Sequence, residues 1–414
     1  MKNKFILILL LVALQAQAQD TLNLMFYNLY RFPVAPPEKR EMILADIFKV
    51  YRPDLFMVCE LVSEAGADRI LDSALQTSRG DFARAPFWYN HSESTDTLQQ
   101  MVFYNRAKLE LTAQTYLQTQ VRDINRYSFR LRNNLADTVR FEVFVAHLKA
   151  GTGSVNRRLR AGMADTFKKA LAGLPAGSAV LLAGDFNLYG TEPAYLTLTD
   201  TTGPVRMTDP LNKPGAWSDN PAFAAIHTQA TRLSAAGFGI GGATGGLDDR
   251  FDFILMSESF RSSPRLYYVD GSYKAFGNNG NCFNQRIDDT ACTGPYSFAL
   301  RRNLHNMSDH TPVVMQLAYP ALPLGAAAPA PVPAARLLSG NIVSSQLVLQ
   351  TDFESREPLV LRIFNTPGQM VKCPPALPGS PALSVIEVGD LPAGLYYLRL
   401  SSGPRSRVFK FIKR

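Results

Sequence analysis

Residues 179–187 read AVLLAGDFN, an apolar run that stops at Gly184 and continues into Asp185 and Asn187. A short, uninterrupted apolar run between polar residues is typical of a buried β-strand. Similar runs predict six further strands, at 22–27, 55–59, 101–104, 141–146, 251–256 and 313–317. The sequence therefore predicts a body built mainly from short buried strands.

Helical patterns are fewer than strand patterns. Two stretches fit helices, at 155–174 and at 38–51, where Pro37 precedes a charged first turn. Many strands with few helices between them predict two sheets packed face to face, with the helices outside. Because 414 residues exceed what one hydrophobic core usually supports, a second domain is also expected.

Side chains that can bind a metal or move a proton lie at the ends of these predicted strands. A single polar residue there has an ordinary explanation, because every strand has to end. The recurrence over six strands gives the set its weight: Asn28, Glu60, His147, Lys149, Asp185, Asn187, Asp252, Asp309 and His310. Carboxylates and amides without a thiolate suit Mg²⁺ or Mn²⁺ better than zinc.

Six ordered blocks carry a resemblance to a known family. They are FYN at 26–28, CE at 59–60, AHLKAG at 146–151, LAGDFN at 182–187, DDRFDFIL at 248–255 and MSDHTPV at 307–313. Together they resemble the endonuclease/exonuclease/phosphatase superfamily, which has the pancreatic-deoxyribonuclease-like fold. The resemblance spans nearly all of residues 20–318. It implies an α/β (α+β) fold, a four-layered αββα sandwich with its site at one end of the two sheets.

The same resemblance implies the metal-binding residues. Glu60 would be the principal ligand of Mg²⁺ or Mn²⁺, and Asp309 would complete the metal's surroundings. Asn28 would lie beside the metal or orient the scissile phosphate. Many members carry an acidic residue two positions after this Asn, where the present chain has Tyr30. A single-metal site led by Glu60 is therefore expected.

The residues for proton transfer follow from the resemblance as well. His310, oriented by Asp252, would act as general base on the attacking water or hold the phosphate. Asp185 and Asn187 would align the nucleophile and a phosphate oxygen, and His147 would stabilise or protonate the leaving group. If His310 takes the proton of the water, it has to start neutral while His147 starts protonated.

Basic residues offer further candidates for phosphate binding. Arg122, Arg126 and Arg130 are spaced four apart, so either a helix or a strand would keep them on one side. Arg126 and Lys149 are the candidates for substrate binding, although a solvated face explains such a run equally well.

The N-terminus predicts export. Lys2 and Lys4 precede an apolar run at 5–14, and Ala-Gln-Ala at 16–18 fits a signal-peptidase site. We therefore expect a signal peptide over residues 1–18, a secreted or cell-surface protein, and no transmembrane segment after cleavage. Because exported cysteines meet an oxidising medium, Cys282 and Cys292 are expected to form a local disulfide.

The C-terminal part differs in composition. Residues 319–335 read YPALPLGAAAPAPVPAA, which is typical of an extended linker. Alternating apolar and polar residues in 336–414 predict a small β-sandwich. An accessory binding module is the plain interpretation. However, the blocks NTPGQMV at 365–371 and DLPAGLYYLRL at 390–400, with a basic end, resemble the C-terminal sorting domain of the type IX secretion system of Bacteroidota. That resemblance implies the secretion machinery as a partner.

The net charge of +8 does not itself predict a polyanionic substrate. Residues 336–414 hold ten Lys/Arg against five Asp/Glu, and residues 1–18 add two Lys, which leaves +1 for 20–335. The leading interpretation is a secreted monomeric nuclease that acts on DNA or RNA. A phosphatase or a phospholipid or sphingomyelin phosphodiesterase is the alternative, and an inactive surface binding protein is the remote one. Choosing between substrates depends on loops, which the sequence does not place.

Overall fold

The computed structural model describes residues 19–79, 81–92, 96–132, 139–239, 242–320, 335–351, 359–377, 380, 382–402 and 405–414. The predicted signal peptide, 1–18, lies outside the described residues, as do residues 321–334 of the predicted linker. The chain divides into two compact units, Met1–Leu322 and Pro323–Arg414.

The first unit contains two sheets. One sheet has the order β11-β13-β1-β2-β4-β3, with β12 also on β13; its strands are β1 (Gln19–Phe32), β2 (Leu55–Leu61), β3 (Phe82–Arg84), β4 (Gln99–Asn105), β11 (Tyr267–Tyr268), β12 (Lys274–Ala275) and β13 (Val313–Pro320). The other has the order β5-β6-β7-β8-β10-β9, from β5 (Leu109–Leu117), β6 (Ile124–Leu131), β7 (Arg140–His147), β8 (Val180–Asp185), β9 (Met207–Thr208) and β10 (Asp252–Ser257).

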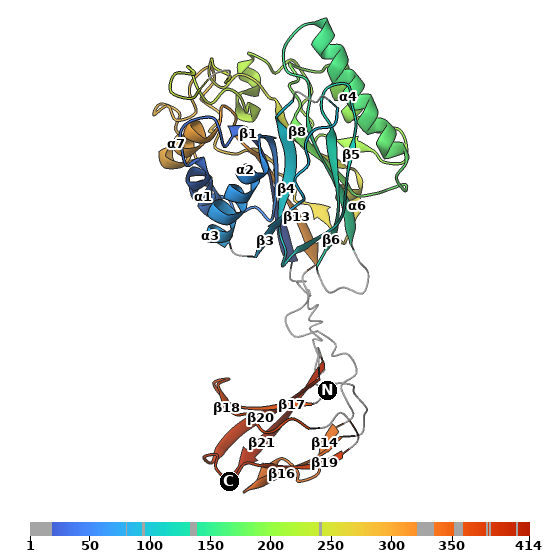
Figure 1. The fold of residues 1–414 in the computed structure, drawn as a ribbon, viewed down its shortest axis with the longest axis vertical. Helices are drawn as coiled ribbons and strands as arrows, with labels where there is room; N and C mark the ends of the chain where they lie inside the picture. The colour runs from blue at the N-terminus through green and yellow to red at the C-terminus, as the bar shows by residue number, and fades with distance from the viewer. Residues whose placement is uncertain are drawn as a thin grey trace, which may run out of the picture. The chain divides into compact units, whose positions relative to one another are not determined.

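Helices cover the outer face of each sheet. Figure 1 shows α1, α2 and α7 on one side of the strands and α4 on the other. The bounds are α1 (Arg40–Val50), α2 (Glu64–Arg69), a π-helical turn η1 (Ile70–Leu75), α3 (Gln76–Arg79), α4 (Ser154–Ala172), α5 (Pro193–Leu198), a 3-10 helix η2 (Pro221–Ile226), α6 (Ser259–Ser262) and α7 (Phe298–Met307). The predicted αββα layering is confirmed.

Three apolar cores explain why these layers pack. Leu24 and Met57 from the first sheet meet Val143 and Leu181 from the second in the core between the sheets. A second core joins the outer face of the first sheet to α1 and α7. A third joins the second sheet to α4 and α5. Strands buried on both faces read as unbroken apolar runs, which is why the sequence revealed them.

All seven predicted strands and both predicted helices are present, with ends shifted by a few residues. The strands that the sequence did not predict include β5 and β6, whose half-buried faces carry polar residues. The Arg-rich run that fitted either a helix or a strand is strand β6, preceded by Arg122. Both ends of the predicted linker 319–335 belong to strands, because β13 extends to Pro320 and β14 begins at Ala335.

The second unit is a small β-sandwich, as predicted. A three-stranded sheet, β14-β16-β19, and a five-stranded sheet, β15-β21-β20-β17-β18, share one apolar core. The strands are β14 (Ala335–Leu337), β15 (Ile342–Val343), β16 (Gln346–Thr351), β17 (Val360–Asn365), β18 (Met370–Lys372), β19 (Ala382–Glu387), β20 (Gly394–Ser402) and β21 (Arg405–Lys413). Within the described ranges, no helix is both long and apolar enough to cross a membrane.

Candidate active site

Three of the predicted site residues form one row across the second sheet. His147 at the end of β7 is paired in register with Asp185 at the end of β8. Asp185 in turn is paired with Asp252 at the start of β10. Residues directly opposite one another on neighbouring strands point to the same face of a sheet. The pairing of the strands therefore places all three side chains together, although more than 100 residues separate His147 from Asp252 in sequence.

Asn28 on β1 connects this row to the first sheet. Its side-chain nitrogen donates to Glu60 Oε1 at 3.1 Å and to Asp185 Oδ2 at 2.9 Å. Asn28 is fully buried, and its side-chain oxygen accepts from the backbone N–H of Tyr30 at 3.0 Å. Glu60 also accepts from the backbone N–H of Arg31 at 3.1 Å. The amide thus holds one carboxylate of each sheet in a fixed position.

His310 faces the row from the segment before β13. Its Nδ1 lies 2.7 Å from Asp252 Oδ2, so the carboxylate accepts from the ring and fixes its orientation. The other ring nitrogen, Nε2, lies 2.5 Å from Gln229 Nε2 and 3.7 Å from Asp185 Oδ2. The predicted dyad of Asp252 and His310 is therefore formed.

A pocket of about 340 Å³ opens above these residues. Six predicted site residues line it: Glu60, His147, Asp185, Asn187, Asp309 and His310. Asn28 and Asp252 support them from fully buried positions. Arg126 and Lys149 do not line this pocket. Arg126 Nε instead pairs with Glu142 at 2.8 Å, and the role of both residues in substrate binding stays a prediction.

Sequence reasoning missed part of the pocket. Gln229 touches His310 but belongs to an irregular segment without a strand or motif to mark it. Arg122, the first of the spaced arginines, lines the wall where Arg126 was expected. It donates to the backbone oxygens of His147 at 3.4 Å and Leu148 at 3.3 Å. The four-residue spacing of the arginines was the only sequence signal for Arg122. It does not show which of the three arginines lines the pocket.

Burial sets unusual protonation states. Burial raises the pKa of Asp185 to about 7, and Asp252 and Glu60 add to this effect. The pKa of Glu60 is raised by burial and by Asp309. Burial lowers the pKa of His147 well below its usual value, helped by Arg122. The site therefore contains more buried negative charge than its own cations neutralise.

His310 has the opposite shift from His147. Burial alone would lower its pKa, but Asp252 and Asp185 raise it well above the usual value. A protonated His310 beside a neutral His147 is the reverse of the starting states that the general-base hypothesis requires. The reason is that burial, with Arg122 nearby, lowers the pKa of His147, whereas Asp252 and Asp185 outweigh the effect of burial on the pKa of His310.

Glu60, His147 and Asp185 are the residues that could hold a metal ion. Among the described residues, the ligand atoms of these three lie within 4.8 Å of one another. Two carboxylates with raised pKa, the half-buried Glu60 and the buried Asp185, form with the neutral imidazole a donor set that a divalent cation would stabilise. Asp309 is not in this group, and its Oδ2 accepts from the backbone N–H of Ala243 at 2.6 Å. Its place in the metal's surroundings stays a prediction. The residues present fit a metal.

Tyr30 occupies the position where many members of the resembled family carry an acidic residue. Its side chain lines the pocket. The guanidinium carbon of Arg232 lies 5.2 Å from the ring centroid of Tyr30, and Arg232 is itself buried. The single-metal site stays a prediction.

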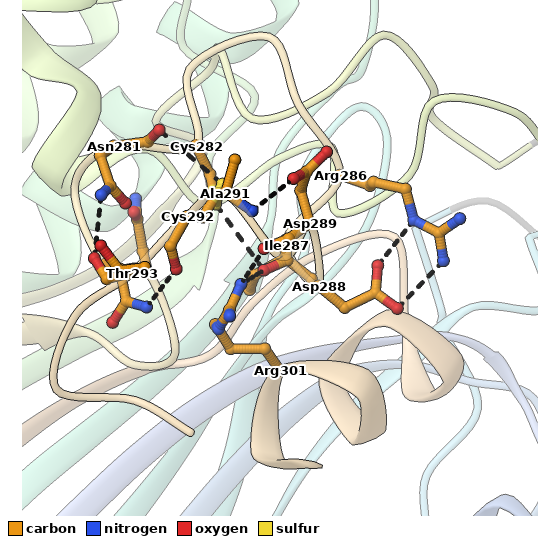
Figure 2. Close-up of a disulfide and its surroundings, with 12 residues drawn as sticks. Asn281, Cys282, Arg286, Ile287, Asp288, Asp289, Ala291, Cys292, Thr293 and Arg301 are labelled. Atoms are coloured by element: carbon orange, nitrogen blue, oxygen red, sulfur yellow. Dashed lines mark hydrogen bonds and ion pairs between the residues drawn. A yellow bond between two sulfur atoms is a disulfide. The ribbon is translucent and has the colours of Figure 1, made fainter. Parts of the chain in front are cut away.

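A disulfide braces the loops behind the pocket. Cys282 and Cys292 are bridged, which confirms the predicted pairing. Figure 2 shows the closed loop, with Arg301 donating to the backbone oxygens of Ile287 at 2.6 Å and Asp289 at 2.8 Å. The N–H of Ile287 also donates to the backbone oxygen of Thr231 at 3.0 Å. The disulfide loop is therefore attached to the segment that supplies Gln229.

Comparisons with known proteins give only distant similarities. No family model and no curated protein matches the chain. Among solved structures, a humanized D. rerio TDP2 is 14% identical over 72% of this chain and 98% of its own, with a TM-score of 0.45. The human Nocturnin catalytic domain is 15% identical over 73% and 97%, with a TM-score of 0.44. An endonuclease/exonuclease/phosphatase from Beutenbergia cavernae is 14% identical over 94% and 100%, with a TM-score of 0.42. Similarity at this level does not establish an activity for this chain, so the geometry of the site has to support it.

Proposed function

We propose that this chain is a divalent-metal-dependent hydrolase of phosphodiester bonds, with DNA or RNA as its substrate. One observation carries the proposal: Asp185 Oδ2 lies 3.6 Å from His147 Nε2 and 3.7 Å from His310 Nε2, inside a single pocket. The Asn28 side chain donates to both Glu60 and Asp185, which places the Glu60 carboxylate at the same point. A cation site, two imidazoles and amide donors around one point match the needs of an anionic ester.

Hydrolysis of a phosphodiester is slow because its anionic oxygens repel an attacking hydroxide. Glu60 and Asp185, with His147 beside them, would hold the cation, which would supply positive charge against those oxygens when bound. His310, kept protonated by Asp252, would donate a hydrogen bond to a phosphate oxygen. This corresponds to the second of the two expected roles, that of holding the phosphate.

The proton of the attacking water needs an acceptor. Burial raises the pKa of Asp185 to about 7 in the metal-free protein, but a bound cation would keep this carboxylate deprotonated, so Asp185 acts as a ligand. His147 is neutral at rest and would be the proton acceptor in the pocket while the carboxylates hold the cation. Asn187, whose N–H donates to Asp185 Oδ1 at 3.0 Å, fixes the orientation of that carboxylate.

The near-neutral body supports an alternative substrate. A nuclease usually neutralises several phosphates with Lys and Arg, but residues 20–335 carry a net charge of only +1. A phosphatase or a sphingomyelin-type phosphodiesterase would need less positive charge. The inactive binding protein is disfavoured because the hydrogen-bonded site is complete.

Turnover with four substrates tests the proposal: plasmid DNA, RNA, sphingomyelin vesicles and a small synthetic phosphodiester, each with and without EDTA. We expect cleavage of a nucleic acid that EDTA abolishes and Mg²⁺ or Mn²⁺ restores. Cleavage of sphingomyelin alone would support the alternative. Activity that survives exhaustive removal of metal would contradict the metal requirement.

Glu60→Gln is the matched variant for this test. An amide binds a hard dication much less well than a carboxylate, so activity should fall mainly through loss of metal. Raising Mg²⁺ or Mn²⁺ should restore part of it. Unchanged metal affinity in this variant would show that Glu60 is not a ligand.

Export remains part of the proposal. The signal peptide at 1–18 and the resemblance of residues 336–414 to a type IX sorting domain support delivery to the cell surface or medium. Deleting 336–414 should leave catalysis intact, because few contacts are expected to cross a linker with the composition of 319–335. The same deletion should stop surface delivery. A folded but inactive truncation would instead make the tail part of the substrate site.

A further inference from the structure

A cluster of aromatic rings lies outside the pocket and takes no part in the chemistry proposed above. His91 stacks on Tyr116 with their ring centroids 4.1 Å apart and their planes 3° from parallel. Trp88 meets the edge of Tyr116 at 5.9 Å and 90°. None of these three residues lines the catalytic pocket. We call Trp88, His91 and Tyr116 the ring platform.

The ring platform faces the same side of the sheet as the catalytic histidine. Tyr116 on β5 is paired with Asn125 on β6, and Asn125 with Val145 on β7. His147 lies two residues beyond Val145 and therefore points to the same face. Tyr116 lies two strand spacings from β7, about 10 Å across the sheet, and the position opposite it on β7 is Val145, two residues before His147. A short stretch of a single nucleic-acid strand would span that distance.

The platform is rigid and is tied to the wall of the pocket. His91 Nδ1 donates to Asp123 Oδ2 at 2.9 Å, and its backbone N–H donates to the same oxygen at 2.8 Å. Asp123 is buried and directly follows Arg122, which lines the pocket. Thr119 bonds both sides of this connection, since its N–H donates to Ser92 Oγ at 2.8 Å and its hydroxyl donates to the backbone oxygen of Arg122 at 2.6 Å.

The free surface of the platform is planar. Tyr116 covers one face of the His91 ring, yet 46% of the His91 side chain remains exposed. Within residues 81–92 and 96–123, Tyr89 is the only strongly exposed large hydrophobic side chain. A lipid surface would be expected to meet several exposed aliphatic groups, which these ranges do not provide. A flat ring with polar edges suits stacking by an unpaired nucleobase. Any of the bases can stack there, because every base has a π-face.

We propose that Trp88, His91 and Tyr116 form a stacking platform for an unpaired base of a nucleic-acid substrate whose scissile phosphate occupies the central pocket. This inference rests on the proposed function and narrows it. Bases inside a duplex are already stacked and cannot reach such a platform. The enzyme should therefore prefer single strands or unpaired ends over continuous duplex DNA.

Steady-state cleavage by the metal-loaded full chain tests the platform. The probes are a single-stranded DNA oligonucleotide and the same oligonucleotide with abasic sites flanking the cleaved bond. Loss of one base-stacking contact should raise KM roughly 5- to 100-fold in Tyr116→Ala and His91→Ala, with kcat little changed. The abasic oligonucleotide should show no such difference between wild type and variants. Tyr116→Phe keeps the ring and should behave as wild type.

Each other outcome has a distinct meaning. Equal losses on normal and abasic DNA would overturn the platform and leave a merely structural role for Tyr116. Cleavage of single strands that the variants do not alter would overturn the platform but keep the nuclease. Absence of nucleic-acid cleavage, with turnover of sphingomyelin vesicles that depends on Tyr116, would overturn both proposals. If Tyr116→Ala fails to fold, His91→Ala and Tyr116→Phe still give the comparison.

Discussion

Two buried charged residues at the start of β10 lie in very different surroundings: Arg250, just before the strand, and Asp252, its first residue. Arg250 is fully buried and donates to Asp209 at 2.7 Å and 2.9 Å through two nitrogens. Its guanidinium also lies 4.2 Å from the ring centroid of Phe253. The pair is balanced, one positive charge against one negative, as buried ion pairs need to be.

Asp252, two residues later, belongs to a cluster that is not balanced. Glu60, Asp185 and Asp309 add negative charge around it, and His310 is the cation that directly contacts it. Among the described residues, Asp252 Oδ1 and His147 Nδ1 have no hydrogen-bond partner. Burial of charge is therefore common to both regions. Unpartnered polar atoms are common to both as well, since Arg250 Nε also has no hydrogen-bond partner within the described ranges, and the excess of one sign of charge is what distinguishes the candidate site.

The largest expected effect is on catalysis. His310→Ala should lower kcat/KM roughly 10³-fold or more, because the phosphate loses its imidazolium partner. Asp252→Asn should cost less, since the ring remains but is poorly oriented. Each change leaves a buried partner unpaired, so the activity is compared per folded molecule. The measurement is kcat/KM of each single variant and of the double variant, with thermal unfolding alongside.

The double variant decides whether Asp252 acts through His310. If the two residues form one unit, their effects will not add. The pH profile gives an independent check, because the raised pKa of His310 should appear as loss of activity at alkaline pH. This alkaline limb should vanish in the His310 variant. Clean additivity, or an unchanged limb, would contradict the dyad.

The next effect is on stability and concerns the balanced pair. Removing one partner leaves the other buried and unpaired, so Asp209→Asn should destabilise the fold by about 3 kcal/mol. Activity per folded molecule should be nearly unchanged. Chemical denaturation and the specific activity of the folded fraction measure both. Loss of activity without loss of stability would place Asp209 in the functional group and break the comparison.

The disulfide provides an intermediate case. Replacing both Cys282 and Cys292 by Ser should lower the free energy of unfolding by roughly 2–3 kcal/mol, since the closed loop is short. Catalysis should fall only slightly, because the loop contacts Thr231 rather than the reacting groups. Denaturation of oxidised wild type, reduced wild type and the double variant separates the bond from its side chains. A double variant as stable as oxidised wild type would contradict this expectation.

The sequence singled out His147, Asp185 and Asp252 because each ends or begins a strand that is mostly or fully buried, whereas their pairing in one row came from the structure. Unbroken apolar runs place strand ends within a residue or two, and register then aligns what lies at those ends. The partnership of His310 with Asp252 came from the resemblance, because the two residues are 58 positions apart.

Other parts of the site depend on tertiary structure alone. Gln229 lies in a loop whose path is set by contacts with Asp249 and His310, and no local pattern marks it. The platform formed by Trp88, His91 and Tyr116 joins a loop with three consecutive aromatic residues, 87–89, to strand β5, and no sequence pattern links the two segments. The protonation of His310 also could not be read from the sequence, because it depends on how many carboxylates surround the ring.

The smallest expected effect is a change in the free energy of unfolding. Its sign should differ between the Arg250–Asp209 pair and the candidate site with Asp185. Asp185 has a pKa of about 7 in the folded protein, raised from 3.8 chiefly by burial. A raised carboxyl pKa means that its contribution to stability is full below pH 4 and is lost as the pH rises through 7. Asp185→Asn should therefore stabilise the metal-free protein at pH 8, by roughly 1–2 kcal/mol or about 4 °C in Tm. The two proteins should differ little at pH 4.

Adding Mg²⁺ or Mn²⁺ at pH 8 should raise the Tm of wild type but not of the variant, because only a carboxylate there binds the cation. Thermal unfolding at both pH values, with EDTA and with metal, measures these differences. If Asp185→Asn instead destabilised the metal-free protein as Asp209→Asn is expected to do, the carboxylate would be a structural partner and the contrast between the two regions would fail.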